Sequence, residues 1–146
     1  MEYKIVDYDK KYAEEVIKLW KYVCVDEYGF EAWEKELNEV EEHKYERLLL
    51  ALVDDKVVAT MAYRDIGQGV SELKRVYTYP DYRGYGISQA MLDIIIEDLK
   101  RLGFLKVFIG TYSRFARAIG FYEKNGFILK KAKGENFEYE RDLKNS

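Results

Sequence analysis

The first third of the chain shows an extended pattern followed by two helical ones. Residues 3–8 alternate weakly between apolar and polar side chains, which predicts a short strand. Asp9 is a suitable N-cap, and apolar residues follow it at helical spacing. A second, very polar helix is predicted over residues 31–43, where Trp33 and Leu37 share one face. We expect this helix to lie at the protein surface.

The middle of the chain changes to strand patterns. Residues 48–53 form an unbroken apolar run, and residues 56–63 and 70–78 are the next two predicted strands. The segments between them, Asp54-Asp55 and Gly67-Gln68-Gly69, are rich in residues typical of turns. Because these connections are short, we expect the three strands to pair antiparallel.

From Ile87 the hydrophobic period becomes helical. Polar residues recur at every fourth position as far as Leu102, so an otherwise apolar helix carries one narrow polar stripe. Gly103 is expected to end this helix as a left-handed C-cap. The run of residues 105–110 then predicts a buried strand, and residues 113–124 predict a final helix.

Two short strands are expected to close the fold. Gly126 follows a helical pattern, which favours a C-cap there over a hairpin turn. Residues 127–130 and 137–143 carry the closing strand patterns, so the element order is β-α-α-β-β-β-α-β-α-β-β. A β-α-β crossover requires parallel strands, whereas the earlier strands require antiparallel pairs. The sequence therefore predicts an α/β (α+β) fold with a mixed sheet.

Composition narrows the class of protein. The chain has 146 residues without a repeat, linker or low-complexity segment, so we expect a single domain over residues 1–146. Its net charge of −3, from 24 basic and 27 acidic residues, gives no electrostatic footprint for nucleic acid or an anionic membrane. No apolar stretch is long enough to span a bilayer, and the N-terminus lacks a secretion signal, which favours a cytoplasmic location.

The residues that usually carry nucleophilic or metal chemistry are scarce. One cysteine, Cys24, and one histidine, His43, form neither an internal disulfide nor a Cys/His zinc cluster. His43 lies in the charged run Glu41-Glu42-His43-Lys44, which favours a solvated helix end over a catalytic role. We therefore expect no metal site and no histidine-dependent nucleophile.

The most informative stretch joins the strand of residues 70–78 to the helix that begins at Ile87. The first turn of that helix has N–H groups without partners, and the helix dipole favours an anion there. Gly84 and Gly86 allow the backbone to approach a ligand closely, and Arg83 adds a positive charge. The loop is therefore a candidate phosphate or pyrophosphate site. The alternative is that the glycines serve only a tight turn between strand and helix.

Three other loop motifs match less well. A dinucleotide fingerprint requires a third glycine where Gln89 stands, and the next strand ends without the required acid. The G-K-[ST] sequence of a P-loop is absent. Residues 86–90 resemble a nucleophile elbow only faintly, because the second glycine is missing and no histidine partner is available.

Two motifs resemble the GNAT superfamily of N-acetyltransferases. Pro80-Asp81-Tyr82-Arg83-Gly84-Tyr85-Gly86-Ile87 is similar to that family's acetyl-CoA pyrophosphate loop, with signature [Q/R]-x-x-G-x-[G/A] mapping to Arg83, Gly86 and Ser88. Ala118-Ile119-Gly120-Phe121-Tyr122-Glu123-Lys124-Asn125-Gly126-Phe127 is similar to a helix and turn common downstream in the family. The resemblance covers nearly the whole chain and implies a GNAT-like, mostly antiparallel central sheet of about seven strands with flanking helices.

The resemblance implies roles for particular residues. Tyr122 occupies the position of the family's tyrosine near the acetyl-CoA sulfur, which is often a general acid. Glu72 matches a strand glutamate that is a general base in some branches, while a surface ion pair with the adjacent basic residues is the alternative. The end of the strand and the loop that follows would hold pantetheine and pyrophosphate, which assigns cofactor binding to Val76, Tyr77, Thr78, Arg83, Gly84, Tyr85, Gly86, Ile87 and Ser88.

The implied activity is transfer of an acetyl group from acetyl-CoA, as co-substrate, to a primary amine within a ternary complex. No motif identifies the acceptor, which could be a small molecule or a peptide, and family members are often homodimers. Two departures from the family pattern motivate an alternative, a non-catalytic acyl-CoA-binding regulatory module. Ser88 replaces the usual Gly or Ala, and Phe115 stands where many members have Asn.

Overall fold

A computed structural model describes residues 1–27, 29, 40 and 44–144. The predicted helix over residues 31–43 therefore lies outside the described residues, apart from Val40. The strands are β1 (Lys4–Asp7), β2 (Arg47–Val53), β3 (Lys56–Gly67), β4 (Val70–Thr78), β5 (Lys106–Tyr112), β6 (Ile128–Lys133) and β7 (Asn136–Asp142). The helical segments are η1 (Lys10–Tyr12), α1 (Ala13–Lys21), η2 (Tyr22–Glu27), η5 (Pro80–Tyr82), α3 (Ile87–Arg101) and α4 (Ala116–Lys124).

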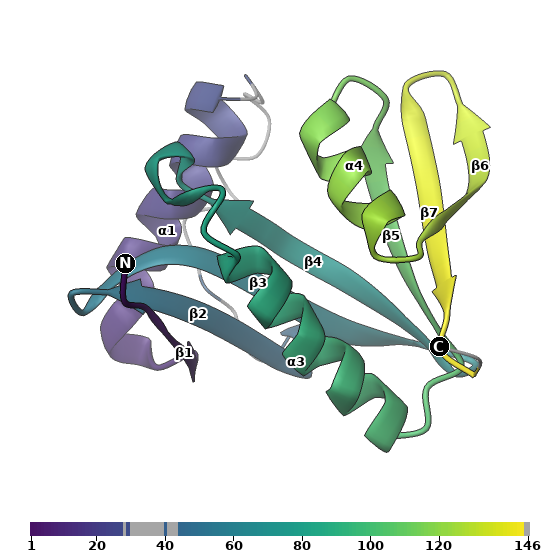
Figure 1. Cartoon of the computed structure of the whole chain (residues 1–146), viewed down its shortest axis with the longest axis horizontal. Coiled ribbons are helices and arrows are strands. Elements are labelled where there is room, and N and C mark those ends of the chain that lie inside the picture. Colours follow the sequence, from purple (N-terminus) through teal and green to yellow (C-terminus); the bar gives the residue numbers. More distant parts are fainter. Residues whose placement is uncertain (28, 30–39, 41–43, 145–146) are drawn as a thin grey trace. The chain divides into compact units, whose positions relative to one another are not determined.

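All seven strands join in one sheet, in the order β1-β2-β3-β4-β5-β7-β6 (Figure 1). Antiparallel pairing links β1 to β2, β2 to β3, β5 to β7 and β7 to β6. The pairing of β4 with β5 is parallel, as the helical crossover between them requires. The predicted mixed and mostly antiparallel sheet is confirmed.

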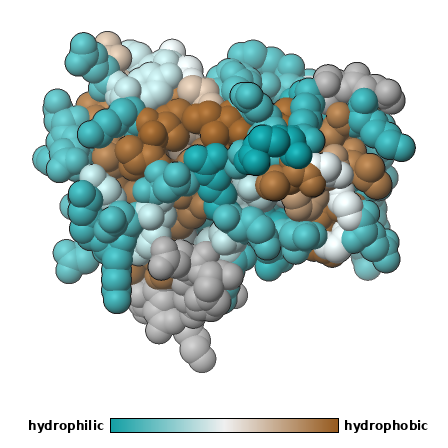
Figure 2. All heavy atoms as spheres, turned by 90° about the horizontal axis from the view of Figure 1, so that it is seen from below, coloured by the Kyte–Doolittle hydropathy of each residue, from teal (hydrophilic) through white to brown (hydrophobic). Residues whose placement is uncertain are grey.

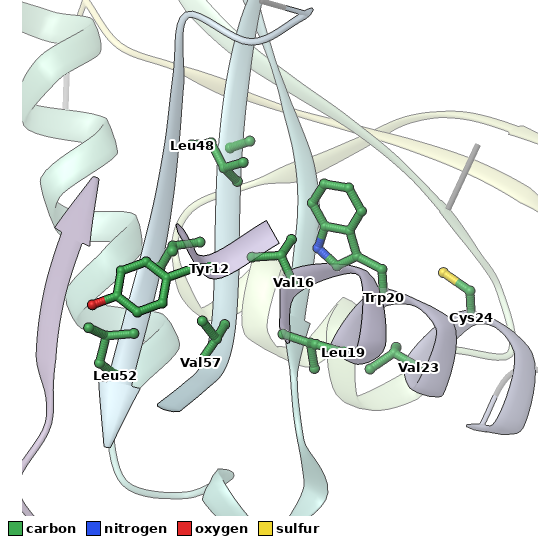
Figure 3. Close-up of a cluster of buried hydrophobic side chains, with 11 residues drawn as sticks. Tyr12, Val16, Leu19, Trp20, Val23, Cys24, Leu48, Leu52 and Val57 are labelled. Atoms are coloured by element: carbon green, nitrogen blue, oxygen red, sulfur yellow. The ribbon is translucent and has the colours of Figure 1, made fainter. Parts of the chain in front are cut away.

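The chain forms two compact units, and the first comprises residues 1–64 and 74–95. In this unit α1 covers one face of β2 and β3, and β2 is buried along most of its length. Burial of each large apolar side chain contributes roughly 1.5–3 kcal/mol. As Figure 3 shows, the side chains of the helix and strands meet in one cluster, made of Tyr12, Val16, Leu19, Trp20, Val23, Cys24, Leu48, Leu50, Leu52, Val57 and Ala62.

The opposite face of the same strands is covered by α3 (Figure 1). Side chains alternate along a strand, so Leu49 and Ala51 point away from the α1 cluster, and both are buried. The part of α3 in this unit buries Ile87, Met91, Leu92 and Ile95. The predicted polar stripe of α3 is confirmed by the exposure of Asp93, Glu97 and Arg101.

The second unit comprises residues 65–73 and 96–146. Here β5 pairs with β7 from Lys106↔Asp142 to Tyr112↔Asn136, and α4 lies beside β5 (Figure 1). The core of this unit includes Val107, Tyr122 and Tyr139. Every residue of β6 is exposed, so this strand contributes pairing rather than core volume.

Several element boundaries differ from the predicted ones. β3 continues to Gly67, because it pairs along β4 as far as the turn that joins them. α1 continues into η2, whose π-type turns widen the helix as far as Glu27. The last helix begins at Ala116 rather than residue 113, and Leu102 is exposed because it follows the end of α3.

The surface mixes hydrophilic and hydrophobic residues. On the face drawn in Figure 2, hydrophilic residues surround a band of hydrophobic ones. None of the helices in the described residues is long and apolar enough to cross a bilayer.

Two helices end with the glycine caps that the sequence predicts. At the end of α4, the N–H of Phe127 donates to the carbonyl of Tyr122 at 3.0 Å, and the N–H of Gly126 donates to that of Glu123 at 3.1 Å. This pair of bonds defines a Schellman motif, which requires the positive φ of 84° found at Gly126. α3 ends in the same way at Gly103, where φ is 85°.

Two glycine substitutions in α4 should change stability in opposite directions. Gly126→Ala should lower the free energy of unfolding by about 1–2 kcal/mol, because alanine is strained at positive φ. Gly120→Ala should raise it by about 0.5–1 kcal/mol, because Gly120 lies inside the helix and an added Cβ meets nothing within 4 Å. Urea unfolding of both variants measures the two changes, and effects of the same sign would contradict the cap assignment.

Candidate functional site

The predicted phosphate loop lies between β4 and α3 in the first unit. Gly84 and Gly86 have φ angles of 86° and 80°, in the left-handed region that favours glycine. A Cβ built on either glycine meets nothing within 4 Å. The backbone conformation therefore favours glycine at both positions, which agrees with a role for these residues in a tight turn between strand and helix. The open space beside both also leaves the loop backbone accessible to a ligand.

The loop leads directly into the N-terminus of a long helix. α3 has 15 residues, and its first amides lack partners within the helix. Gly84, Tyr85 and Gly86 are exposed, whereas the side chain of Ile87 is buried in the core. The site therefore offers backbone N–H groups and the positive end of a helix dipole, which suit a phosphate or pyrophosphate.

Thr78, the last residue of β4, holds both ends of this loop. Its carbonyl accepts a hydrogen bond from Nε of Arg83 at 3.1 Å. Its hydroxyl lies 3.0 Å from the hydroxyl of Ser88 in the first turn of α3. The Ser88 hydroxyl, which replaces the glycine or alanine of the family signature, therefore links the helix to the strand.

Arg83 is held by a carboxylate from another part of the first unit. Its Nη2 lies 2.7 Å from Oε2 of Glu27 at the end of η2, and both side chains are 20% exposed. The charge of Arg83 is thus fixed in place, and it is partly balanced by Glu27. No local sequence signal pairs these two residues, which are 56 positions apart.

β4 bends at Arg75, which sequence reasoning did not single out. Arg75 has a φ of 54° within the strand, a left-handed conformation that costs of order 1–3 kcal/mol for a residue other than glycine. Its carbonyl accepts a hydrogen bond from the hydroxyl of Thr60 at 2.8 Å. Thr60 in turn accepts from Nε1 of the fully buried Trp20 at 3.0 Å. Two buried side chains therefore hold the bend.

The bend follows the end of the parallel register between β4 and β5. That register pairs Val70 with Lys106, Ser71 with Val107 and Glu72 with Phe108. The backbone of residues 76–78, which was predicted to bind the pantetheine arm, lies beyond these pairs. A strand backbone outside its ladder offers N–H and C=O groups to an extended ligand.

The two predicted catalytic residues belong to the second unit, whereas residues 76–78 and the loop belong to the first. Glu72 is half-buried in β4. Tyr122 is buried in α4, and its ring lies 5.8 Å from that of Phe121 and 5.7 Å from that of Phe127. These neighbours fix the orientation of the Tyr122 ring.

Cys24 is not placed as a nucleophile. Its side chain is buried, and its thiol donates to the hydroxyl of Tyr77 at 3.4 Å. Burial raises the pKa of the Cys24 thiol, so the reactive thiolate is scarce at neutral pH. Among the described residues, no group of three His, Cys, Asp or Glu side chains is placed to hold a metal ion.

Comparison with known proteins decides the family. The sequence model of the acetyltransferase (GNAT) family matches residues 10–127. The chain belongs to the GNAT family. The predicted family membership is thus confirmed, and members of the family use acetyl-CoA as acetyl donor. No curated protein sequence matches the chain closely enough to count as a relative.

Solved structures agree with this assignment. A GNAT-family acetyltransferase from Staphylococcus aureus Mu50 has a TM-score of 0.88 and 26% identity, over 98% of this chain and 100% of its own. A PaiA N-acetyltransferase from Thermoplasma acidophilum, in complex with coenzyme A, shares the fold at TM-score 0.81 and 24% identity, over 97% and 99% of the two chains. The ribosomal-protein-S18-alanine N-acetyltransferase from Escherichia coli also shares the fold, at TM-score 0.77 and 17% identity, over 97% and 94%.

A double-mutant cycle should measure how strongly Trp20 and Thr60 support the bend of β4. Thr60→Val should destabilise the protein by about 2–4 kcal/mol, because it leaves the Trp20 N–H and the Arg75 carbonyl unpaired in the interior. Trp20→Phe removes the first of these groups. The double variant should therefore be about 1 kcal/mol more stable than the sum of the single effects predicts. Chemical unfolding measures this coupling, and strict additivity would show that the Trp20–Thr60 bond contributes nothing.

Proposed function

We propose that this GNAT protein transfers an acetyl group from acetyl-CoA to a primary amine, by direct attack in a ternary complex. The observation that carries the proposal is the loop between β4 and α3, in which Gly84 and Gly86 adopt left-handed conformations immediately before the helix N-terminus. Residues 1–146 act as one catalytic domain, and the setting is cytoplasmic. The acceptor is a small molecule or a peptide.

The residues of the loop and of the preceding strand bind the cofactor. The N–H groups of residues 84–88 hold the pyrophosphate, and the fixed guanidinium of Arg83 adds a positive charge close to them. The backbone of residues 76–78 pairs with the pantetheine arm. The N–H of Val76 is the donor for the oxyanion that forms when the amine attacks the thioester.

The transfer itself requires two proton movements. A nitrogen–carbon bond forms, the carbon–sulfur bond breaks, the amine loses a proton and the departing sulfur gains one. An acceptor amine with the pKa of lysine, ~10.4, is neutral in only about one molecule in 2,500 at pH 7, a penalty of roughly 4.6 kcal/mol. Glu72, directly or through water, is the group proposed to accept that proton, and the hydroxyl of Tyr122 is proposed to protonate the sulfur.

Direct transfer also agrees with the chemistry that the chain offers. The one cysteine is buried, and its pKa is raised by burial, so it is poorly suited to carry an acetyl group. The substrate amine supplies the nucleophile, and acetyl-CoA supplies an already activated acyl group. The enzyme then contributes orientation, oxyanion stabilisation and proton transfer.

The proposed function predicts how the protein binds its cofactor. Isothermal titration should show saturable binding of acetyl-CoA at one site, with a Kd that rises with salt because the pyrophosphate carries the recognition. NAD should give no heat at the same concentrations, since the loop lacks the dinucleotide fingerprint. Absence of acetyl-CoA binding at millimolar ligand would overturn the proposal. Binding without turnover in a broad amine panel would instead favour the regulatory module.

The proposed function also predicts the effect of removing the Tyr122 hydroxyl. Tyr122→Phe should lower kcat by about 10²-fold, because general-acid catalysis is lost, while the Kd for acetyl-CoA changes less than about threefold. Tyr139→Phe is a matched control, since Tyr139 is a buried tyrosine of the same unit whose hydroxyl donates to Glu123 at 3.4 Å. The control should keep kcat within about twofold. Equal rates for the two variants would remove Tyr122 from the mechanism.

A further inference from the structure

Arg75 is a half-buried cation that has no carboxylate partner among the residues that the structure describes. Its Nη1 atom has no exposed surface and no hydrogen-bond partner in the part of the chain that the structure describes. Arg75 takes part in none of the ion pairs formed by the described residues. Its Nε donates to the hydroxyl of Tyr45 at 3.0 Å, which leaves the Nη1 edge of the guanidinium without a partner.

Within the described residues, the groups around this guanidinium are two phenol hydroxyls, a thiol and an indole ring. We call Arg75, Trp20, Cys24, Tyr45 and Tyr77 the Arg75 cluster. Burial raises the pKa of the Cys24 thiol and that of the Tyr77 phenol, so both keep their protons at neutral pH. The indole ring of Trp20 lies 4.4 Å from Cζ of Arg75 and is uncharged. The cluster therefore carries one unbalanced positive charge.

This arrangement lowers the free energy of unfolding of the protein. Stacking on the Trp20 ring offsets part of this cost. The missing ion-pair partner and the unpaired buried N–H of Nη1 still disfavour folding. The same residue also has the left-handed φ of 54°. Two independent costs at one residue point to a functional role, because such strain persists mainly at binding and catalytic sites.

The chemistry that would balance the cluster is a carboxylate. A guanidinium presents a planar fork of N–H donors that matches the two oxygens of a carboxylate. Arg75 as a whole is only partly buried, so a ligand can reach it from solvent if the side chain turns to present Nη1. Arg75 also directly precedes Val76, the proposed oxyanion donor, in β4.

We propose that the Arg75 cluster binds a carboxylate of the acceptor, so that the preferred acceptor is a small amine that also carries a carboxylate. This inference rests on the proposed function and specifies its substrate class. The Arg75 guanidinium pairs with the carboxylate, which restores the missing partner of Nη1. The same pairing places the amine of the acceptor towards the thioester. Uncharged amines lack this contact and bind less well.

The experiment compares amines that differ only in the carboxylate. The pairs are β-alanine with β-alaninamide and 4-aminobutanoate with 4-aminobutanamide, assayed at saturating acetyl-CoA. The wild-type enzyme should favour the acid of each pair by at least tenfold in kcat/KM. Arg75→Gln should bring the ratio of the two kcat/KM values, acid over amide, to within about twofold of one, whatever the rate that remains. Equal rates for acid and amide in the wild-type enzyme would overturn the inference, although acetyl-CoA binding and turnover would still support the proposed function.

A second readout does not depend on turnover. The Nε–H resonance of Arg75 in the wild-type ¹⁵N spectrum should move on titration with either amino carboxylate and stay in place with the matching amides. Arg75→Lys identifies the resonance by its loss. The assignment of a carboxylate site would be overturned if the chemical shift of this resonance did not change with the amino carboxylates, or if it changed equally with inorganic phosphate.

Discussion

The hydrogen bond from the Thr60 hydroxyl to the Arg75 carbonyl is the constraint on which the use of β4 depends. A regular strand would continue its ladder past residue 75, and its backbone groups would be taken up by neighbouring strands. In β4 the register with β5 ends at Glu72, the left-handed conformation follows at Arg75, and a buried hydroxyl satisfies the Arg75 carbonyl. The first residues of β4 can then pair with β5, while the last ones remain available for a ligand. The N–H of Trp20 completes the chain of bonds, so the helix α1 supports a strand conformation that no local propensity favours.

Two arginines near this bend show how differently one charge can be used. Arg83 is paired with Glu27 and with the carbonyl of Thr78, so it is rigid and partly neutralised. This arrangement suits a group that shapes a loop, because the backbone amides can then bind the anion. Among the described residues, Arg75 forms no ion pair, and its Nη1 atom has no hydrogen-bond partner. Arg83 and Arg75 therefore differ in their interaction partners rather than in how deeply their charges are buried. This difference favours distinct roles for the two arginines.

How much could be predicted from the sequence depended on the range of each interaction. The caps at Gly103 and Gly126 follow from local rules, since a helical pattern ends there at a residue that tolerates positive φ. The phosphate loop was equally local, because strand, glycines and helix are contiguous. The ion pair between Glu27 and Arg83 joins residues 56 positions apart, and no periodicity in the sequence predicts it. The bend at Arg75 has one local signal in the sequence, because Lys74 and Arg75 are consecutive charged residues in a strand. Either one of the two side chains faces inward, or the alternation of the strand breaks there.

The scarcity of classical catalytic residues is consistent with the proposed reaction. Acyl transfer through a covalent enzyme intermediate needs an enzyme nucleophile and a base that activates it. Direct transfer from a thioester needs no enzyme nucleophile, because the acceptor amine itself attacks once it has lost its proton. What the protein must supply is a backbone that holds the cofactor, a donor for the oxyanion and a means of orienting the amine. In the proposed mechanism, backbone groups at a bend and a glycine loop meet the first two needs, and these depend on conformation rather than on side-chain chemistry. The third need falls to side chains, and a strained, unbalanced arginine beside the proposed oxyanion donor is the described group whose chemistry still requires a partner.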